Sequence, residues 1–457
     1  MGGPILSVKV ASMGRERIRI GGGAGFSGDR IDPAVALAER GELDYLVFEC
    51  LAERTIALAV RAKRGNPEGG YDPLLEERLS AVLPTATRSG TKIISNMGAA
   101  NPMAAARATA AIARKLGLRA LRIAAITGDD VLAEISGASP LLEGGTVAEW
   151  PGELIAANAY LGAEPLVQAL AEGADIILTG RVADPSLFLA PMIHDFGWPA
   201  DDWHRLGQGT VVGHLLECAG QVSGGYFADP GHKDVAGLAD LGFPFADITA
   251  IGEAEISKLP GSGGCITTAT CAEQLLYELH DPAAYLTPDV TADFRGVQFE
   301  ERGSDVVAVS GGSGTVRPEK LKVTLGFHEG YIGEGQISYA GSGCVARGQL
   351  ALGIVEERLK RLGNDVIEIR LDLIGVNSVA PGAVAPADQR EVRARIAARA
   401  RTPQAAAQVG REVEALYTNG PTGGGGVAFS VKPIVAVAST LLSRDAITPL
   451  LHWEIVT

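Results

Sequence analysis

The fold is decided by the stretch Arg17-Ile18-Arg19-Ile20, followed by Gly21-Gly22-Gly23-Ala24-Gly25-Phe26-Ser27-Gly28-Asp29-Arg30. A short β-type run enters a glycine-rich loop, and Asp32-Pro33 then resembles a helix start, with Asp as N-cap and Pro at the first helical position. In α/β proteins such a loop brings backbone N–H groups close to a phosphate or carboxylate. We therefore predict a small-molecule site at the end of this N-terminal strand. Its candidate ligand-binding residues are Gly23, Gly25, Ser27, Gly28, Asp29 and Arg30.

The same glycines also fit a dinucleotide-binding pattern. Gly23, Gly25 and Gly28 match G-x-G-x-x-G, and Glu49 follows the next predicted strand at about the ~20-residue offset of a ribose-binding acid. In that fingerprint, however, the third glycine already lies at the helix start, and a chain with 59 glycines matches the pattern easily by chance. A dinucleotide site, another ligand-binding loop and a purely structural turn all stay open.

Strand and helix patterns alternate through the first half of the chain. The strand patterns are Tyr45–Phe48, Lys92–Ser95, Leu121–Ile126 and Asp175–Leu178. The helical patterns are Pro33–Arg40, Ala52–Ala62, Pro102–Leu116, Pro165–Ala171 and Pro185–His194. This alternation predicts an α/β fold with a parallel sheet and helices on both faces, in a Rossmann-like arrangement.

The pattern changes past residue 240, where glycines and short alternating strands become common. Two long helical patterns interrupt these strands, Val345–Leu362 and Gln389–Leu416, the second with a break near Pro403. We predict that residues 1–245 form an α/β ligand-binding domain and that residues 246–457 form an α+β domain that completes the site.

Composition excludes several classes of protein. The 457 residues are 46% apolar and carry a net charge of −14, which disfavours nucleic acid and an anionic membrane surface as partners. No apolar run approaches the ~20 residues of a membrane-spanning helix, and basic residues interrupt any signal-peptide core near the N-terminus. The five scattered cysteines do not form a disulfide framework. We expect a cytoplasmic protein with free thiols, and its many small residues suit a homo-oligomer.

Polar side chains follow two of the predicted strands, and active sites of open α/β sheets lie outside the carboxyl ends of the strands. Asn96 and Asn101 follow one strand, and Thr179, Arg181 and Asp184 follow another. Arg181 is suited to hold a carboxylate or phosphate through two parallel hydrogen bonds, and Asp184 is a candidate catalytic acid. Alternatively, Asn101 and Asp184 are helix N-caps and Arg181 is a surface ion-pair partner.

The best catalytic candidates are His214, Glu217 and Cys218. On a helix they lie at i, i+3 and i+4 and share one face, so that the carboxylate orients the imidazole for proton transfer and Cys218 is a candidate nucleophile. The alternatives are a buried, hydrogen-bonded histidine and a core cysteine. We predict no metal site, because no third or fourth ligand is evident nearby.

Two further glycine-rich loops contribute candidate ligand-binding residues. Gly263, Gly264 and Thr267 lie in the first, and Gly424 lies in the second. Backbone N–H groups of such loops form anion-binding nests. Three glycine loops in one chain favour an extended polar ligand, for which a coenzyme A thioester, with its diphosphate and acyl head, is suited.

Several segments, in this order, resemble the acyclic terpene utilisation protein A (AtuA) family over about residues 17 to 455. These are Gly21–Arg30, Leu178–Ser186, Gly213–Gln221 with Gly224–Gly231, and Glu273–Pro282. The resemblance implies a role in bacterial catabolism of citronellol- and geraniol-type branched acids through CoA thioesters, and it carries over no catalytic residue. Longer members of the family have an additional small, ferredoxin-like C-terminal domain. This chain ends at Thr457 without it, so we expect a separate small partner subunit.

Together these features predict an enzyme that acts on a branched carboxylate or its CoA thioester as a hydratase, dehydratase or related lyase. His214 and Glu217 would move protons, and Asn96, Asn101 and Arg181 would orient the acyl head. The alternatives are an NAD(P)-dependent oxidoreductase and a non-catalytic subunit of a multienzyme complex. No cofactor is assigned.

Overall fold

The computed structural model describes residues 3–4, 14–386 and 388–457. The chain divides into two compact units. The larger unit contains the chain up to Ala148, Ile155–Leu325 and Val437–Thr457, and the smaller unit contains Glu149–Leu154 and Gly326–Ala436. The boundaries of these units differ from the predicted domain boundary at residue 245. That residues 246–457 complete the site stays a prediction.

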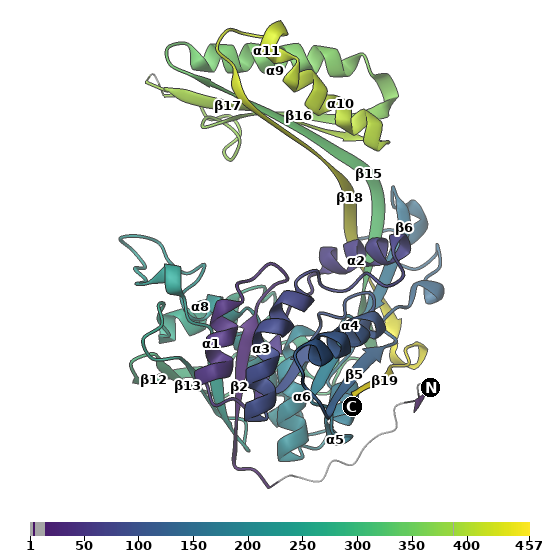
Figure 1. Ribbon diagram of the computed structural model, residues 1–457, viewed down its shortest axis with the longest axis vertical. Coiled ribbons are helices and arrows are strands. Elements are labelled where there is room, and N and C mark those ends of the chain that lie inside the picture. Colours follow the sequence, from purple (N-terminus) through teal and green to yellow (C-terminus); the bar gives the residue numbers. More distant parts are fainter. Residues whose placement is uncertain (1–2, 5–13, 387) are drawn as a thin grey trace. The chain divides into compact units, whose positions relative to one another are not determined.

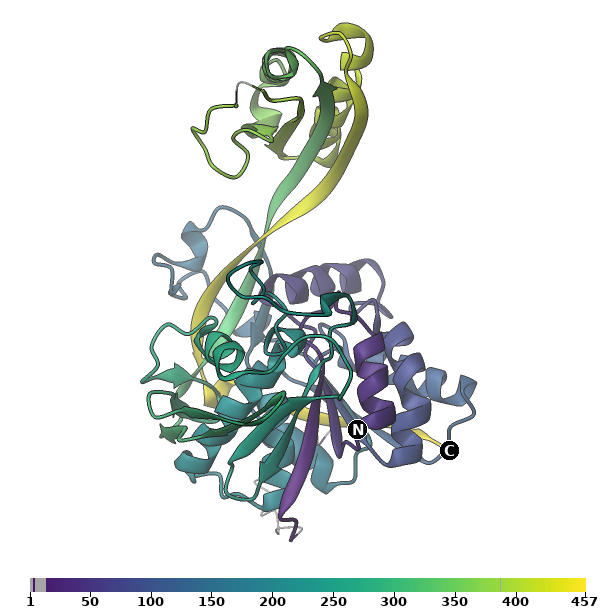
Figure 2. The same ribbon diagram turned by 90° about the vertical axis from the view of Figure 1, so that its left-hand side faces the viewer.

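An eleven-stranded mixed sheet forms the centre of the larger unit. Its five parallel strands lie in the spatial order β2 (Arg17–Ala24), β3 (Tyr45–Phe48), β4 (Lys92–Ser95), β7 (Ile176–Thr179), β5 (Leu121–Thr127). Antiparallel strands flank them, as Figure 2 shows for the purple β2 beside the teal strands that follow it. These are β8 (Pro244–Thr249), β9 (Ala254–Lys258), β13 (Val306–Ser310) and β12 (Gln298–Gly303) beyond β2, and β19 (Leu450–Val456) and β1 (Gly3–Pro4) beyond β5. The predicted mixture of helices with parallel strands is confirmed.

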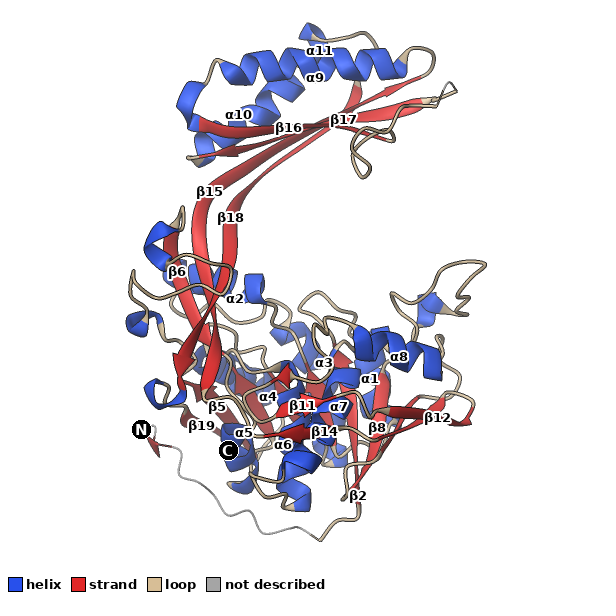
Figure 3. Ribbon diagram, turned by 180° about the vertical axis from the view of Figure 1, so that it is seen from behind, coloured by secondary structure: helices blue, strands red, loops and turns tan. Residues whose placement is uncertain are grey.

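Helices pack on both faces of this sheet. In Figure 1 the nearer face carries α1 (Asp32–Arg40), α3 (Leu75–Ser89) and α4 (Pro102–Lys115). In Figure 3, seen from behind, the other face carries α5 (Glu164–Ala171), α6 (Asp184–Phe196) and α7 (Trp203–Glu217). Small residues such as Ala105 and Ala110, both fully buried, let α4 lie close to the strands.

The neighbours β4 and β7 connect to opposite faces of the sheet. β4 leads into α4 on one face, whereas β7 leads into α6 on the other. Loops that leave adjacent parallel strands in opposite directions open a crevice at the carboxyl ends of the strands, which is where open α/β sheets bind ligands. The topology therefore points to the segments that follow β4 and β7.

The N-terminal glycines differ from the prediction of a glycine loop after a short strand. Gly21, Gly22 and Gly23 are the end of β2 itself. Asp32 is the first residue of α1, Ile31 occupies the N-cap position, and no side chain caps this helix. The missing side chains serve close packing: an ideal Cβ on Gly22 would lie 2.8 Å from the carbonyl oxygen of Leu216.

The smaller unit has the order β-α-β-β-α-β of the ferredoxin-like arrangement. Its elements are β15 (Lys320–Ala340), α9 (Cys344–Lys360), β16 (Val366–Ile374), β17 (Glu391–Ala400), α10 (Pro403–Glu414) and β18 (Gly425–Ser443). The strands lie in the spatial order β16-β17-β15-β18, and α9 and α10 share one hydrophobic core with them. The first residues of β15, 320–325, and the last residues of β18, 437–443, belong to the larger unit.

The predicted helix Gln389–Leu416 is wrong in its first half, which forms β17. Val392, Ala394, Ile396 and Ala398 are all buried, and the arginines that alternate with them are partly exposed, although Ala397 is buried too. That period of two is typical of a strand with one buried face, although alanine and arginine favour a helix. The predicted break near Pro403 coincides with the start of α10.

The remaining α-helices and strands of the described chain are α2 (Glu53–Gly65), β6 (Glu153–Ala159), α8 (Thr268–Leu276), β10 (Tyr285–Leu286), β11 (Thr291–Asp293), β14 (Ser313–Thr315) and α11 (Leu416–Asn419). None of the helices in the described part of the chain has the length and apolar character needed to span a bilayer. All five cysteines are free.

Candidate active site

Three buried polar side chains follow three neighbouring parallel strands. Glu49 follows β3, Asn96 follows β4, and Arg181 comes two residues after β7. Because β3, β4 and β7 are adjacent and parallel, these residues lie at one edge of the sheet, at the crevice described above.

Asn96 fixes the carboxyl group of Glu49. Its Nδ2 donates to Glu49 Oε1 at 2.9 Å, and its Oδ1 accepts from the backbone N–H of Cys50 at 2.7 Å. The backbone N–H of Leu51 donates to the same Glu49 oxygen at 2.8 Å. Burial and the neighbouring Asp184 raise the pKa of Glu49 to about 8, so this carboxyl group holds its proton at neutral pH.

Arg181 is fully buried and bound mainly by backbone carbonyl groups. Its guanidinium donates to the carbonyl oxygens of Leu51 and Val182 and to Asp184 Oδ1. The guanidinium carbon also lies 4.6 Å from the ring centroid of Tyr160. This arginine is therefore a structural anchor that joins the β3 and β7 loops, rather than a surface ion-pair partner.

A second buried carboxylate holds the backbone of Arg181. Asp129 Oδ2 accepts from the Arg181 N–H and from Asn158 Nδ2, both at 2.9 Å. A Cβ on Gly180 would lie 2.4 Å from Asp129, so glycine is required where this carboxylate meets the chain. Burial raises the pKa of Asp129 to about 6, although both hydrogen bonds favour the ionised form.

Two acids at helix starts border Arg181 and Tyr160. Asp184 is the first residue of α6, and Glu53 is the first residue of α2. Burial raises the pKa of Asp184 even though Arg181 opposes this shift. At Glu53 burial also opposes ionisation, but hydrogen bonds from Lys322 at 2.6 Å and from Tyr160 at 2.9 Å hold the pKa below its ordinary value.

His214 and Glu217 form a buried pair on the last turn of α7. His214 Nδ1 lies 2.8 Å from Glu217 Oε1, the i, i+3 contact that the sequence predicts. The rings of Tyr285 and Phe294 pack against the imidazole at centroid distances of 5.2 and 5.6 Å. Glu217 Oε2 is buried and has no hydrogen-bond partner in the described residues.

The electrostatics of this pair connect it to the β7 loop. Burial, with Asp184 and Glu278 nearby, raises the pKa of Glu217 to about 7. Burial lowers the pKa of His214, but Glu217 outweighs it and the net shift is upward. Because Asp184 raises the pKa of both Glu49 and Glu217, the acids of the β3, β7 and α7 segments lie within electrostatic range of one another. We call Glu49, Arg181, Asp184, His214 and Glu217 the strand-end cluster.

Cys218 is the C-cap residue of α7. Burial and the adjacent Glu217 raise the pKa of its thiol far above the ordinary value. Because the thiolate is the nucleophilic form, this environment disfavours the predicted role of Cys218 as a nucleophile.

The N-terminal glycine loop packs against protein groups. A Cβ on Gly25 would lie 2.5 Å from the carbonyl carbon of Cys218, and one on Gly23 would lie 2.6 Å from the Phe48 ring. The N–H groups of Gly25 and Arg30 both donate to the Asp29 carboxylate, at 2.9 and 2.8 Å. Both donors are thus already used within the loop.

A buried arginine binds the backbone of this loop. Arg78 of α3, which is fully buried, donates to the carbonyl oxygens of Ser27 and Asp29 at 3.1 and 3.3 Å. The third glycine of the pattern, Gly28, would place a Cβ 2.8 Å from the ring of Phe26, which is 58% exposed. These contacts favour the interpretation of the glycine-rich segment as a structural turn over that of a ligand-binding loop.

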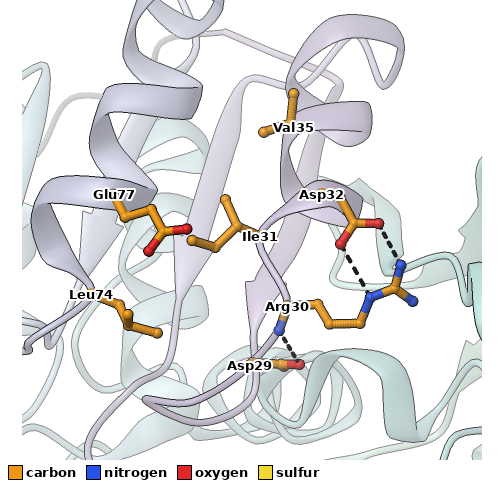
Figure 4. Close-up of a pocket in the computed structure, with 7 residues that line it drawn as sticks. All are labelled: Asp29, Arg30, Ile31, Asp32, Val35, Leu74 and Glu77. Atoms are coloured by element: carbon orange, nitrogen blue, oxygen red, sulfur yellow. Dashed lines mark hydrogen bonds and ion pairs between the residues drawn. The ribbon is translucent and has the colours of Figure 1, made fainter.

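The surface hollow beside the loop carries excess negative charge (Figure 4). Its volume is about 570 Å³, and Asp29, Asp32 and Glu77 line it together with Arg30. Arg30 forms an ion pair with Asp32, so no cation of this lining is left for a phosphate. The hollow therefore offers little to an anionic ligand.

The other predicted ligand-binding residues have local structural partners. Asn101 caps α4 and donates to the carbonyl oxygens of Pro67 and Gly69, and Thr179 Oγ1 donates to the carbonyl oxygen of Gly180. Thr267 caps α8 in a capping box. Gly263 and Gly264 pack against the backbone of Gly237 and Ser223, and Gly424 belongs to the smaller unit.

Sequence reasoning missed several residues of the site. Tyr160, Asp129 and Asn158 surround Arg181, and Tyr285 and Phe294 cover His214. They lie in segments with no motif around them. A signal did exist for Glu53, because Ala52-Glu53 and Ala183-Asp184 follow two strands in the same way.

Comparison with known proteins identifies one family. The family described as "Acyclic terpene utilisation family protein AtuA" matches residues 18–453. No curated protein and no solved structure matches the chain.

Proposed function

Because the chain belongs to the AtuA family of acyclic terpene utilisation, we propose that it is an enzyme of branched-chain organic acid catabolism. Its reaction would be a hydration, a dehydration or a related lyase step on a branched carboxylate or its CoA thioester. The strand-end cluster would be its active site.

The observation that carries this proposal is the gathering of buried acid–base groups around Asp184. Asn96 and the Leu51 N–H hold the Glu49 carboxyl group, and Glu217 shares a hydrogen bond with His214, while burial and Asp184 raise the pKa of both carboxyl groups. Buried titratable groups with perturbed pKa values at the carboxyl ends of parallel strands are a mark of a functional site. Glu49 suits a general acid, and the His214–Glu217 pair suits a general base.

The proposed addition of water balances without a redox step. The His214–Glu217 pair takes a proton from water, and the water oxygen bonds to the β-carbon of a double bond conjugated to the acyl carbonyl. Glu49 gives its proton to the α-carbon. Proton transfer from the pair back to Glu49 through solvent restores the enzyme, and dehydration follows the same steps in reverse.

Two predicted roles change in this proposal. Asn96 uses its amide on Glu49 and Cys50, so it acts as a positioning residue that holds the acid. Arg181 is bound by Leu51, Val182 and Asp184, so it stabilises the loops around the acids rather than clamping a substrate carboxylate. Tyr285 and Phe294 supply an apolar wall beside the base.

An NAD(P)-dependent oxidoreductase is less well supported. The glycines of its fingerprint contact Phe48, Cys218 and Phe26, and two N–H groups of the loop are taken by Asp29. Glu49, the candidate ribose-binding acid, keeps its proton and bonds Asn96. A non-catalytic subunit has no specific observation in its favour, since it does not explain the buried acid–base groups.

The test is a hydration assay on purified protein. Branched α,β-unsaturated acids and their CoA thioesters are incubated with the wild type, and the loss of the conjugated double bond is followed by absorbance. We expect hydration of at least one ligand class, with a loss of about 100-fold or more in Glu217→Gln and Glu49→Gln. The exposed Glu273→Gln variant, on the neighbouring helix α8, is the control. If ligands bind but the double bond persists under all conditions, the lyase assignment is wrong.

A further inference from the structure

The side chain of Gln274, which belongs to α8, binds the end of helix α7. Its Nε2 donates to the carbonyl oxygen of His214 at 3.0 Å. The last four carbonyl groups of a helix have no partner within the helix, and at this end the N–H of Cys218 contacts Leu216 rather than His214. Gln274 therefore satisfies one of these carbonyl groups from a position that is only 2% exposed.

This contact brings α8 against the face of α7 that carries the acid–base pair. The Gln274 side chain opposes the rise in the pKa of the Cys218 thiol, and the backbone of Leu275 contributes to the raised pKa of His214. Glu217 shares the same helix face, with its Oε1 2.8 Å from the imidazole Nδ1. A neutral carboxamide thus lies beside the His214–Glu217 pair.

Two acceptor atoms at this contact have no donor among the described residues. They are Glu217 Oε2 and Gln274 Oε1, and each belongs to a side chain that is about nine-tenths buried or more. His214 Nε2 is also buried without a hydrogen-bond partner there. Because buried polar atoms in proteins nearly always have a partner, these atoms indicate where a polar group binds. Two acceptors require a group with two donors, and water is the smallest molecule that has them.

We propose that Gln274 Oε1 and Glu217 Oε2 bind the water molecule that adds to the substrate. Gln274 is then a positioning residue of the reaction. This inference rests on the proposed function and deepens it. One O–H of the water donates to Glu217 and the other donates to Gln274, which leaves a lone pair of the water oxygen free to attack.

The two O–H groups of this water have different fates. The proton that faces Glu217 passes to the His214–Glu217 pair, and the water oxygen forms a bond to the β-carbon. The electrons of the double bond move to the α-carbon, which takes the proton of Glu49. The O–H held by Gln274 stays in the product as its hydroxyl group. A neutral amide suits this role, because a carboxylate would add to the negative charges that already raise the pKa of Glu217.

A high-resolution crystal structure of wild type tests the water site without any substrate. We expect one ordered water within about 2.5–3.0 Å of both Gln274 Oε1 and Glu217 Oε2, and we expect its loss in Gln274→Leu. If no water bridges the two oxygens, or if protein donors satisfy them, the inference is overturned.

Hydration rates test the positioning role on the substrates of the hydration assay. In Gln274→Leu we expect kcat to fall about 10-fold or more with KM nearly unchanged, because the water rather than the acyl group loses a contact. Gln274→Glu keeps an acceptor but lacks the donor to His214. Its added charge should move the acid limb of the pH–rate profile to higher pH by about one unit. The exposed Gln404→Leu, on helix α10, is the control.

The outcomes separate the two proposals. If Gln274→Leu and Gln274→Glu lose activity equally and keep the pH profile of wild type, Gln274 only caps α7, and the inference is overturned while the proposed function stands. If wild type hydrates neither the branched α,β-unsaturated acids nor their CoA thioesters, the proposed function fails. The role of Gln274 in the reaction then fails with it, whatever the crystal structure shows at the two oxygens.

Discussion

At the scale of single residues, Glu49 gives the protein a distinct dependence of stability on pH. Its pKa is about 8 in the folded protein against an ordinary value of 4.5. Between these values the folded state holds a proton that the unfolded state has released. The contribution of Glu49 is therefore fully present below about pH 4.5 and is lost as the pH rises toward about 8.

Replacing this carboxyl group with a neutral amide removes that dependence. In wild type the free energy of unfolding should fall as the pH rises. We expect Glu49→Gln to make this fall less steep, by up to about 1.4 kcal/mol per pH unit between about pH 6 and 8. The measurement is urea unfolding of wild type and variant across this range. The exposed Glu39→Gln is the control. Parallel curves for wild type and Glu49→Gln would show that Glu49 ionises normally.

Arg181 allows a second prediction at this scale. A lysine keeps the charge but cannot reach Leu51, Val182 and Asp184 with one ammonium group. Because buried carbonyl groups and a carboxylate would lose their donors, Arg181→Lys should cost about 3 kcal/mol of unfolding free energy. Urea unfolding measures this loss against the exposed Arg54→Lys. A loss no larger than that of the control would contradict the anchoring role.

The importance of Arg181 is visible in the sequence, but its structural role is not. Its position after a strand marks it as a residue of the site. Its partners are mainly backbone oxygens of Leu51 and Val182, and such groups have no sequence signature. The His214–Glu217 contact is predictable because helix geometry alone brings i and i+3 together.

At the scale of elements, the glycines of β2 and its loop determine how closely this strand approaches α7. Gly25 would place a Cβ 2.5 Å from backbone atoms of Cys218, whereas Gly28 would meet only the exposed ring of Phe26. We expect Gly25→Ala to cost about 1–3 kcal/mol and Gly28→Ala less than about 1 kcal/mol. Chemical unfolding of both variants gives the comparison. Equal costs would contradict the packing role, and a nucleotide bound by wild type but lost in Gly28→Ala would favour the dinucleotide site.

Elements with unambiguous patterns are predictable, and those with mixed signals are not. The bounds of β3 and β4 match the predicted strands because short apolar runs between turns have one interpretation. No predicted pattern corresponds to α3, and β15 is one long strand although the sequence past residue 240 predicts only short ones. The glycines of this region suggest a break, but Gly333 is paired within the strand opposite Ala398.

At the scale of the whole molecule, the two units have separate hydrophobic cores. Val413 lies in the core of the smaller unit, and Leu46 lies in a core of the larger unit. Proteins with separate cores often depart from two-state unfolding. We expect calorimetry to give two resolvable transitions, with Val413→Ala lowering one and Leu46→Ala lowering the other by about 2 kcal/mol or more. A single two-state transition that both variants shift equally would contradict this expectation.

The smaller unit bears on the predicted partner. A ferredoxin-like order of elements is present within this chain, at 326–436. A separate small subunit of the same type and assembly into a homo-oligomer stay predictions. Size-exclusion chromatography with light scattering, on protein purified from its native host, measures both.

The most direct measurement is deuterium incorporation from D₂O into a branched α,β-unsaturated acyl thioester during its hydration, followed by mass spectrometry. With the cluster as the active site, wild type should place deuterium on the α-carbon, because Glu49 exchanges its proton with solvent and delivers it there. Glu217→Gln should bind the thioester but exchange at least about 100-fold more slowly. Equal exchange by wild type and variant, or a bound thioester that wild type leaves unlabelled, would contradict the assignment of the strand-end cluster as an acid–base site.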